Sequence, residues 1–370
     1  MSFNTEPTYR HGSPERCAVL LVNLGTPDAP TPAALRRYLA EFLWDPRVVE
    51  IPRPLWWLIL HGVILRTRPA QSAAKYASIW TGDGSPLLTW TERQAKRLQG
   101  DLGQRGHAVI VRPAMRYGQP AIATALDALK AEGATRILVL PLYPQYAAAT
   151  TASSFDAVAA WAHRTRRLPE LRFVNHYHDD AGYIDALAAS VSAHWRREGR
   201  ALKLVMSFHG LPARSLSLGD PYHCECHVTA RLLAQRLRLA AEDYLVTFQS
   251  RLGRAKWLEP YTEPALKQLA AQGIDSVDVI CPGFPADNLE TLEEINIEAR
   301  ATFLGAGGKR FEFIPCLNDQ DGWIRALTDI TLQHLQGWPT QRLDDQAQDD
   351  AQAAARAEQR RRAVAMGASD

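Results

Sequence analysis

The sequence predicts an α/β protein made of two similar halves, each with a parallel β-sheet, which face each other across a central cleft. Along most of the chain, short apolar runs alternate with segments of helical period, which is the pattern of parallel sheets covered by helices on both faces. Strand-to-turn segments of the first half have counterparts in the second half. With 370 residues, of which 46% are hydrophobic, the chain suffices for one large or two ordinary domains.

Short apolar runs that end at Pro, Gly or Asn predict the strands. In chain order they are Ala18–Leu24, Ala108–Pro113, Arg136–Leu140, Leu171–Val174, Lys203–Phe208, Tyr244–Phe248, Val277–Ile280 and Arg310–Ile314. The clearest helical periods between them are Thr89–Leu102, Ala121–Ala131, Ile184–Arg197, Val228–Leu239 and Thr262–Ala271. Divided between two halves, these strands predict two parallel four-stranded sheets.

The repetition is visible at two pairs of strand ends. Val19–Pro27 parallels Leu204–Pro212, and Val139–Gln145 parallels Ile280–Ala286. In each segment a strand runs into a turn with Pro or Gly that precedes a helix. The alternative is that any two such turns look alike, because Gly and Pro are the residues they require. We favour duplication.

We place the two domains at residues 1–165 and 166–340, followed by a polar tail at 341–370. Within the tail, Asp344–Arg362 is rich in Ala, Gln, Asp and Arg and has almost no large apolar side chain. Because such a segment has no apolar face to bury, we expect it to form a solvated helix or to be disordered.

Composition restricts the partners and the compartment. The formal net charge is +2, from 42 basic and 40 acidic residues, so no general attraction to nucleic acid is expected. The five cysteines show no paired pattern, which favours a reducing compartment. Met1–Arg16 is polar and lacks the apolar region of a secretory signal. We therefore expect a cytoplasmic protein.

The longest apolar stretch is Leu55–Leu65, which is interrupted by His61 and Gly62 and flanked by arginines. It is too short to cross a bilayer, which takes about 17–25 residues. The adjacent Trp56 and Trp57 would face different sides of a helix, which favours a segment that touches the membrane surface or forms the lip of a pocket. An ordinary buried helix is the alternative.

Two polar side chains follow predicted strands at the mouth of the second sheet. His209 lies in Ser207–Pro212, and Glu290 lies in Phe284–Leu292. Ligands of open α/β sheets bind at this edge, and a neutral imidazole opposite a carboxylate can carry protons and hold a divalent metal. The alternative for His209 is a histidine satisfied by backbone hydrogen bonds in its turn.

Glu290 also begins a row of acidic side chains. Glu290, Glu294 and Glu298 are four residues apart, and Asp287 lies one turn earlier, so an α-helix would carry the three glutamates on one face. A row that leads away from a cleft could conduct protons or divalent cations. The alternative is a solvated acidic face.

A second group of potential metal ligands lies in one short segment: His223, Cys224, Cys226 and His227. The Cys-x-Cys spacing is not that of a zinc site, and no second cysteine pair follows. On a helix the two cysteines point about 200° apart. We interpret the group as mainly structural, with an accessory metal site as the alternative.

Aromatic side chains gather on predicted turns, which suits a flat apolar ligand at the mouth of a sheet. They are Tyr76, Tyr117, Tyr143, Tyr146, Trp257 and Phe284. Arg116, beside Tyr117, could meet a carboxylate of such a ligand.

From about Ala18 to Leu335 the chain resembles bacterial ferrochelatase. The matching segments are Leu21–Pro27, Gly84–Pro86, Met115–Gly118, Tyr143–Tyr146, Thr150–Ser154, Ser207–Pro212, Gly219–Tyr222, Gln249–Arg251, Trp257–Pro260 and Asp287–Leu292. Each segment alone is a weak signal, but in this order they are highly specific.

The resemblance implies two doubly wound, Rossmann-like domains of the chelatase type around a porphyrin cleft. It implies insertion of ferrous iron into protoporphyrin IX to give protohaem, the last step of haem biosynthesis. His209 and Glu290 become the catalytic and metal-binding pair, with Asp287, Glu294 and Glu298 as a proton or metal relay. The porphyrin would lie among Leu24, Tyr76, Arg116, Tyr117, Tyr143, Trp257 and Phe284. The stretch around Trp57 becomes the lip that meets the inner membrane surface, and a monomer is expected.

The chain departs from some ferrochelatases at two places. Those relatives hold an iron–sulfur cluster partly by cysteines in a C-terminal extension, but here no cysteine follows Cys316, and Ala147–Ala149 occupies a stretch where they carry a ligand. We therefore expect no such cluster and no permanently bound cofactor, with ferrous iron as a substrate. Asn288 stands where some relatives have a second histidine, so the resemblance does not extend a proton-bridging role to this position.

Other functions share parts of this pattern. A chelatase that inserts cobalt or nickel into a less oxidised tetrapyrrole typically supplies paired histidines, whereas here one histidine faces a glutamate. A haem or porphyrin carrier needs an axial ligand and an apolar pocket but no acidic relay. A bilobal solute-binding protein shares the architecture, but the lack of a signal sequence argues against it.

Overall fold

Two parallel four-stranded sheets with the same strand order form the frame of the computed structural model, which describes residues 3–251, 253, 255–341 and 346–369. The first sheet has the order β2-β1-β3-β4, with β1 (Arg16–Thr26), β2 (Val109–Gly118), β3 (Ala134–Pro141) and β4 (Glu170–Phe173). The second has the order β6-β5-β7-β8, with β5 (Lys203–His209), β6 (Tyr244–Gln249), β7 (Ser276–Ile280) and β8 (Arg310–Phe313). The predicted α/β class and all eight predicted strands are confirmed.

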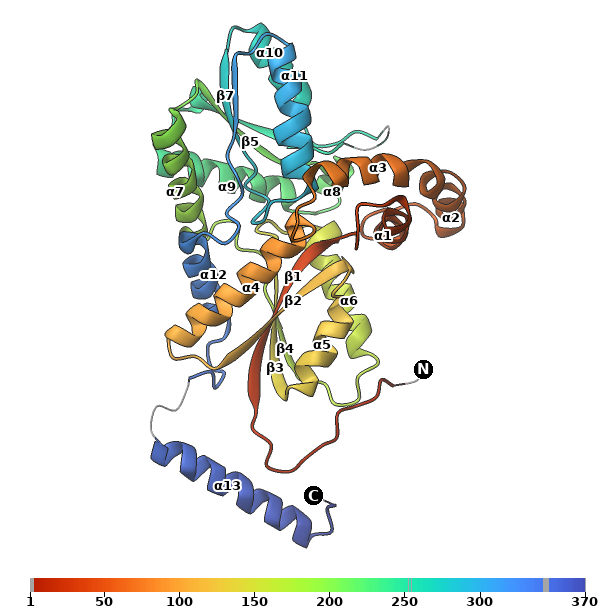
Figure 1. Ribbon diagram of the computed structural model, residues 1–370, viewed down its shortest axis with the longest axis vertical. Helices are drawn as coiled ribbons and strands as arrows, with labels where there is room; N and C mark the ends of the chain where they lie inside the picture. Colours follow the sequence, from red (N-terminus) through yellow and green to blue (C-terminus); the bar gives the residue numbers. More distant parts are fainter. Residues whose placement is uncertain (1–2, 252, 254, 342–345, 370) are drawn as a thin grey trace.

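Helices cover both sheets (Figure 1). Those of the first half are α1 (Pro32–Trp44), α2 (Arg53–Ile59), the π-helix η1 (Leu60–Ile64), α3 (Leu65–Ile79), α4 (Pro86–Gln104), α5 (Ile122–Ala131), the π-helix η2 (Ala148–Ala152) and α6 (Ser153–Ala162). Those of the second half are α7 (Ala181–Glu198), α8 (Arg214–Ser217), α9 (Tyr222–Leu237), the 3-10 helix η3 (Ala241–Asp243), α10 (Thr262–Ala271), the π-helix η4 (Glu290–Ala299), α11 (Arg300–Gly305) and α12 (Asp321–His334).

Equivalent backbone hydrogen bonds support the predicted duplication. The N–H of Val174 donates to the carbonyl of Val139 in the first half, and the N–H of Ile314 donates to that of Val279 in the second. Beyond the strands, the Tyr177 N–H bonds the Pro144 carbonyl, as the Asn318 N–H bonds that of Pro285. The loops after β3 and β7 are therefore folded in the same way.

The central strand β1 shows why these strands are continuous apolar runs. Ala18–Val22 is completely buried, and its side chains alternate between two cores. Val19 and Leu21 face the core that contains α7, α9 and α12, whereas Leu20 faces α5 and α6. Because both faces of a parallel sheet are covered, alternate residues cannot be polar. Each buried Leu or Val side chain stabilises the fold by about 1.5–3 kcal/mol.

One hydrophobic core joins the two halves. It contains residues of β1 and β3, such as Leu21 and Leu138, together with residues of β5, such as Met206. The late helix α12 belongs to this core and packs against α4 of the first half (Figure 1). The domain limits at residues 165 and 340 stay a prediction, because this packing crosses between the halves.

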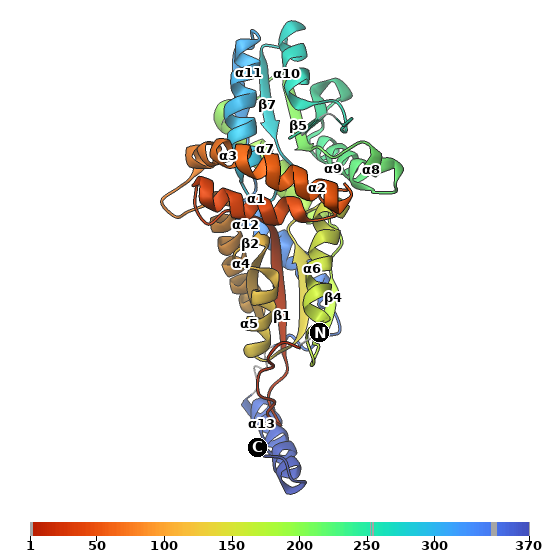
Figure 2. The same cartoon turned by 90° about the vertical axis from the view of Figure 1, so that its right-hand side faces the viewer.

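The apolar stretch forms α2 and η1, which lie with α1 and α3 as a band between the levels of the two sheets (Figure 2). Trp56 is buried and donates from Nε1 to the Leu43 carbonyl at 2.7 Å, whereas Trp57 is half exposed. The two tryptophans thus face different sides, as predicted. Among the described residues, no helix combines the length and the apolar character needed to span a membrane.

The described part of the tail forms a helix, α13 (Gln346–Ala365), that lies away from both sheets (Figure 1). Of the segment Asp344–Arg362, residues 344 and 345 lie outside the described residues. From residue 350 on, the side chains of α13 are mostly exposed. The described part of the tail therefore takes the solvated helical form, the first of the two expected states.

Candidate active site

His209 is the last residue of β5, at the carboxyl edge of the second sheet. Its Nδ1 lies 2.6 Å from the carbonyl oxygen of Gly210. Because a carbonyl oxygen only accepts, this hydrogen bond assigns the proton to Nδ1 and leaves the lone pair of a neutral ring on Nε2. The Tyr222 hydroxyl donates to the carbonyl of His209 at 2.9 Å. The histidine is therefore held at both its ring and its backbone.

Two aromatic side chains border His209. The Phe284 ring lies 6.4 Å from the imidazole, centroid to centroid. Trp257 packs against Gly210, where a Cβ atom would come within 3.2 Å of the indole and 2.6 Å of the Gln249 carbonyl. Only glycine fits this position, so the Gly after the histidine allows the β6 edge and the indole to approach.

Glu290 is the first residue of η4 and interacts electrostatically with His209. Gln249 connects the two segments: it pairs with His209 in the sheet register, and its Nε2 donates to the Glu290 carbonyl at 2.9 Å. Its Oε1 accepts from Ser207 Oγ at 2.8 Å. Sequence reasoning missed Gln249 as a site residue. The signal was its place at the end of β6, in a segment that matched the family pattern.

Burial raises the pKa of the Glu290 carboxyl above its ordinary value, and the nearby His209 opposes this shift. The charges of Glu294 and Glu293 raise the pKa further. Glu290 therefore holds a proton more readily than an exposed glutamate does. A carboxyl and an imidazole that are close together and exchange protons easily are suited to acid–base chemistry.

The segment after Glu290 is a π-helix, so the predicted α-helical stripe is corrected. In a π-helix the backbone bonds run from i to i+5, and residues five apart come together. Glu293 and Glu298 both bind Lys75 Nζ, at 2.9 and 2.7 Å. Glu294 turns instead to Ser250, accepting from its N–H at 2.7 Å and from its hydroxyl at 2.5 Å. The α-helical period gave no signal for Glu293.

The ammonium group of Lys75 partly compensates the negative charge of η4. Burial alone would lower the pKa of Lys75, but Glu298 and Glu293 raise it above its ordinary value. For the acid Glu293 the directions are reversed, because burial raises its pKa and Lys75 lowers it. Lys75 belongs to α3 of the first half, so this ion pair also joins the two halves beside Glu290.

Asp287 is buried and supports the loop that leads into η4. Its Oδ1 accepts from Thr291 Oγ1 at 3.0 Å and from the Cys316 N–H at 3.2 Å, and its Oδ2 accepts from Asn318 Nδ2 at 2.7 Å. Asn288 Oδ1 accepts from the Thr291 N–H at 3.0 Å and thus caps the helix. Both side chains therefore hold the loop that leads to Glu290.

The first half supplies an aromatic cluster opposite the second sheet. Tyr76 and Tyr117 are buried in it, and Leu24 packs against it. Leu289, the neighbour of Glu290, packs against the same cluster, and the charge of Glu290 contributes to the raised pKa of Tyr76, after burial. The structure thereby brings the ends of β1 and η4 together. Tyr143 is also buried, with 8% of its surface exposed.

Arg116 is engaged within the protein. Its guanidinium donates to Asp45 Oδ2 at 2.5 Å and to Ser153 Oγ at 2.7 Å, and it lies 4.5 Å from the Tyr117 ring centroid. The Tyr117 hydroxyl donates to the same carboxylate at 2.8 Å. Burial alone would raise the pKa of Asp45, but hydrogen bonds from Ser153, the Arg47 N–H and Tyr117 lower this pKa below its ordinary value. A ligand carboxylate would have to compete with Asp45 for Arg116.

The four potential ligands on α9 do not gather into one site. Cys226 is buried and Cys224 is exposed, so the cysteines lie on different sides of the helix. The His223 and His227 rings lie 5.5 and 6.2 Å from the Phe248 ring. These contacts favour the structural interpretation of the segment.

Known proteins resemble this chain over nearly its whole length. The family model for ferrochelatase matches residues 16–335. The ferrochelatase of Methylibium petroleiphilum is 71% identical over 353 residues, which cover 95% of this chain and 97% of that protein. The ferrochelatase of a Polaromonas species is 64% identical over 372 residues, which cover both chains completely.

A solved structure of SirB from Bacillus subtilis with Fe3+ has a TM-score of 0.52 and 12% sequence identity, and covers 86% of this chain and 95% of that one. At this identity the likeness concerns the fold alone, and it agrees with the chelatase-type architecture expected from the sequence. The family model spans both sheets and the segments of His209 and Glu290. The chain therefore belongs to the ferrochelatase family.

Proposed function

We propose that this protein inserts ferrous iron into protoporphyrin IX, with release of two protons, to give protohaem in the last step of haem biosynthesis. The observation that carries the proposal is the electrostatic interaction of His209, at the edge of the second sheet, with a partly buried Glu290, in a chain that belongs to the ferrochelatase family. The aromatic cluster of the first half contacts Leu289, the residue before Glu290, which supports the proposal. The pair supplies acid–base groups, and the aromatic residues supply a surface for a flat apolar substrate.

His209 is proposed to accept a pyrrole proton and to face the metal. The hydrogen bond from its Nδ1 to Gly210 leaves Nε2 with a lone pair, and an imidazole in this state can take up a proton or bind a divalent cation, one at a time. The Tyr222 hydroxyl and the β5–β6 register keep the ring at the sheet edge. Iron enters this scheme as the substrate.

Glu290 is proposed to take the second proton and to share the metal with His209. Its raised pKa favours uptake of a proton from the porphyrin. From Glu290, the proposed route for protons or iron leads to Glu294, which lies four residues later on η4. Glu298 lies farther out, where Lys75 partly compensates its charge, and Asp287 supports the loop. We therefore narrow the proposed relay to Glu290 and Glu294.

The porphyrin is proposed to lie between the two sheet edges. Phe284 and Trp257 border the side of His209, and Tyr76, Tyr117 and Leu24 border the other side. Tyr143 completes the proposed wall. Arg116 is proposed to act on this wall indirectly, because its guanidinium already holds Asp45 and the Tyr117 ring.

We also propose a peripheral contact with the inner membrane surface through α2 and η1. Leu55, Trp57, Leu58 and Val63 are all more than half exposed, and Arg66 and Arg68 beside them are exposed as well. Apolar side chains flanked by basic residues are typical of interfacial helices. Such a lip would suit a substrate and a product that dissolve poorly in water. A monomer in the cytoplasm without an iron–sulfur cluster stays our prediction.

The decisive experiment is anaerobic visible absorbance of the purified protein with protoporphyrin and ferrous iron, beside the variant His209→Ala. We expect many turnovers to haem in the wild type and none above background in the variant. His163→Gln, which changes an exposed histidine on the outer end of the first half, is the matched control and should retain the wild-type rate. A stoichiometric porphyrin complex without turnover would instead indicate a carrier. Turnover that requires Co2+ or Ni2+ and a different tetrapyrrole would indicate a different chelatase.

A further inference from the structure

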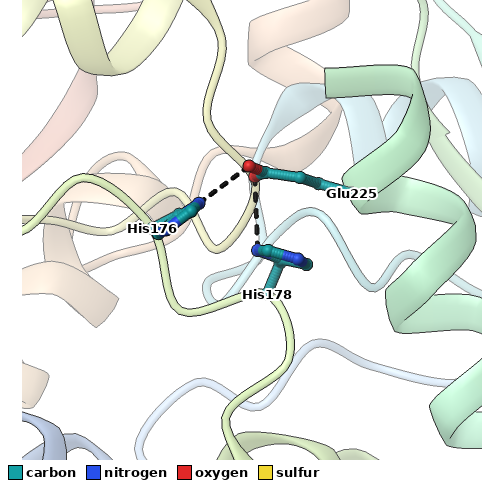
Figure 3. A group of neighbouring side chains, drawn as sticks. All are labelled: His176, His178 and Glu225. Carbon is teal, nitrogen blue, oxygen red and sulfur yellow. Dashed lines mark hydrogen bonds and ion pairs between the residues drawn. The ribbon is translucent and has the colours of Figure 1, made fainter. Parts of the chain in front are cut away.

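Three side chains that could ligate a metal lie close together at a second place in the fold (Figure 3). His176 and His178 lie in the loop between β4 and α7, and Glu225 lies on α9. One ligand atom of each lies within 4.8 Å of those of the other two. Within the described part of the chain, this is the only such group of three His, Cys, Asp or Glu side chains.

The cluster is built into the fold. Glu225 and His178 are 6% and 8% exposed. His178 Nδ1 lies 3.3 Å from Glu225 Oε2 in a geometry that makes no hydrogen bond, and this buried nitrogen has no hydrogen-bond partner. An unpaired buried polar group destabilises the folded chain. A cation between the imidazole and the carboxylate would satisfy both groups.

The distances are near those of a tetrahedral site. Nitrogen and oxygen ligands bind Zn2+ at about 2.0–2.1 Å, which places neighbouring ligand atoms about 3.3–3.4 Å apart. The contact between His178 and Glu225 already has this length. His176 Nδ1 lies 2.7 Å from Glu225 Oε1, a hydrogen bond whose proton a metal would displace. The His176 side chain would have to move outward to reach this spacing from Glu225, and it is 49% exposed.

We propose that His176, His178 and Glu225 bind a divalent transition-metal cation of the Zn2+ class, at a site separate from the one where iron is inserted. Two imidazoles and one carboxylate are the ligands of such cations, whereas Mg2+ and Ca2+ prefer oxygen ligands alone. The half-exposed His176 leaves the site open to solvent. A water molecule can therefore complete the coordination.

The position of the site suggests a stabilising role. Glu225 Oε2 also accepts from the Tyr146 N–H at 2.7 Å, in the loop that follows β3. Thr229 Oγ1, one turn farther along α9, donates to the His178 carbonyl at 2.7 Å. A metal here would tie the loop after β3 and the connection from β4 to α7 to α9, whose first residue, Tyr222, holds the backbone of His209. Bound cation would thus stabilise the folded chain by mass action.

The test uses the full chain with His209→Ala and Glu290→Gln, so that the iron site contributes no ligands. After removal of metals, bound Zn2+ is counted by equilibrium dialysis, and Co2+ binding is followed by d–d absorption, whose intensity reports a four-coordinate site. We expect one Zn2+ per chain, an intense Co2+ spectrum, and a rise in Tm with Zn2+. His176→Gln, Glu225→Gln and their combination with His178→Gln should each weaken binding at least about tenfold.

Two controls keep the result interpretable. His223→Gln with His227→Gln removes the other histidines near α9 and should leave binding unchanged. Because His176 is half exposed, His176→Gln should keep the circular dichroism spectrum and the metal-free Tm of its parent, so its loss of metal would not reflect unfolding. Absence of stoichiometric Zn2+, or binding that survives the triple variant or disappears only with His223 and His227, would overturn the proposal.

Discussion

The carboxyl edges of the two sheets carry different chemistry, although the sheets share one strand order. Leu24 of β1 follows the register pair of Asn23 with Met115 of β2, and in the second sheet His209 of β5 pairs with Gln249 of β6. Likewise η2 begins with alanines, whereas η4 begins with Glu290. The same frame thus presents an apolar edge on one side and titratable groups on the other.

The polar groups at the edge of the first sheet are hydrogen-bonded to one another. Asp45 accepts from Arg116, Tyr117 and Ser153, so its charge is compensated within the protein. In the second half, burial and neighbouring carboxylates raise the pKa of Glu290. The difference teaches that one half of a duplicated fold can become a rigid wall while the other keeps the reactive groups. The variants below test this division, from the largest expected effect to the smallest.

Replacing His209 should have the largest effect on activity. We expect His209→Ala to lower the rate of iron insertion by more than about a hundredfold, the usual contribution of a proton-transferring side chain. The equivalent change in the wall, Leu24→Ala, should mainly raise the KM for porphyrin. Initial rates of haem formation measure both, and circular dichroism checks the fold. Equal losses of kcat in the two variants would contradict the division.

Glu290→Gln should be nearly as damaging as His209→Ala, because glutamine keeps the shape but neither takes up a proton nor binds a cation well. We expect a loss of about a hundredfold in kcat, with little change in porphyrin affinity. Fluorescence quenching by protoporphyrin measures this affinity independently. A variant that keeps more than half of the wild-type kcat would remove Glu290 from the proposed mechanism.

Asp45→Asn should instead act on stability. It leaves Arg116 and the Tyr117 hydroxyl without their shared anion, and we expect unfolding to become easier by about 2–4 kcal/mol at neutral pH. Because hydrogen bonds lower the pKa of Asp45, this stabilisation is present above the ordinary value of 3.8 and is lost as the pH falls through the lower folded-state value. Urea denaturation at several pH values measures the trend.

The matched control for Asp45 is Asp156→Asn, which removes a surface ion pair with Arg47 whose partners are 41% and 42% exposed. This change should cost less than about 1 kcal/mol. If Asp45→Asn and Asp156→Asn lower the free energy of unfolding equally, the buried cluster around Asp45 does not stabilise the first half as we describe.

The raised pKa of Glu290 predicts the opposite pH dependence. A buried acid with a raised pKa favours folding below its ordinary pKa, and this contribution is lost as the pH rises through the folded-state value. Glu290→Gln should therefore have a higher Tm than the wild type near neutral pH, by on the order of 2 °C. The gain should vanish near pH 4. Calorimetry at both pH values checks the sign, and a gain that grows in acid would refute it.

Glu298→Gln should have the smallest effect, a loss of less than about threefold in rate. Its carboxylate is 52% exposed and shares Lys75 with Glu293. Glu294→Gln should cost more, because this residue is next to Glu290 on the proposed route and also holds Ser250. A larger loss for Glu298 than for Glu294 would place the route along the outer acids.

The sequence by itself determined the strands, the repetition of the two halves and the family. These features depend on local patterns, because a strand covered on both faces must be a continuous apolar run, as Ala18–Val22 is. His209 and Glu290 were predicted as site residues because each follows such a run. Even the different orientations of Trp56 and Trp57 follow from helical geometry alone.

Only the tertiary structure decided how distant side chains pair. Three hydrogen bonds of this kind join segments that are far apart in the chain. They connect Gln249 with Glu290, Arg116 with Asp45, and His176 with Glu225. The π-helical turn that brings Glu293 to Lys75 likewise has no signal in an α-helical period. Apolar periodicity records which face of an element is buried, whereas the partner of a polar side chain depends on which other element packs against that face.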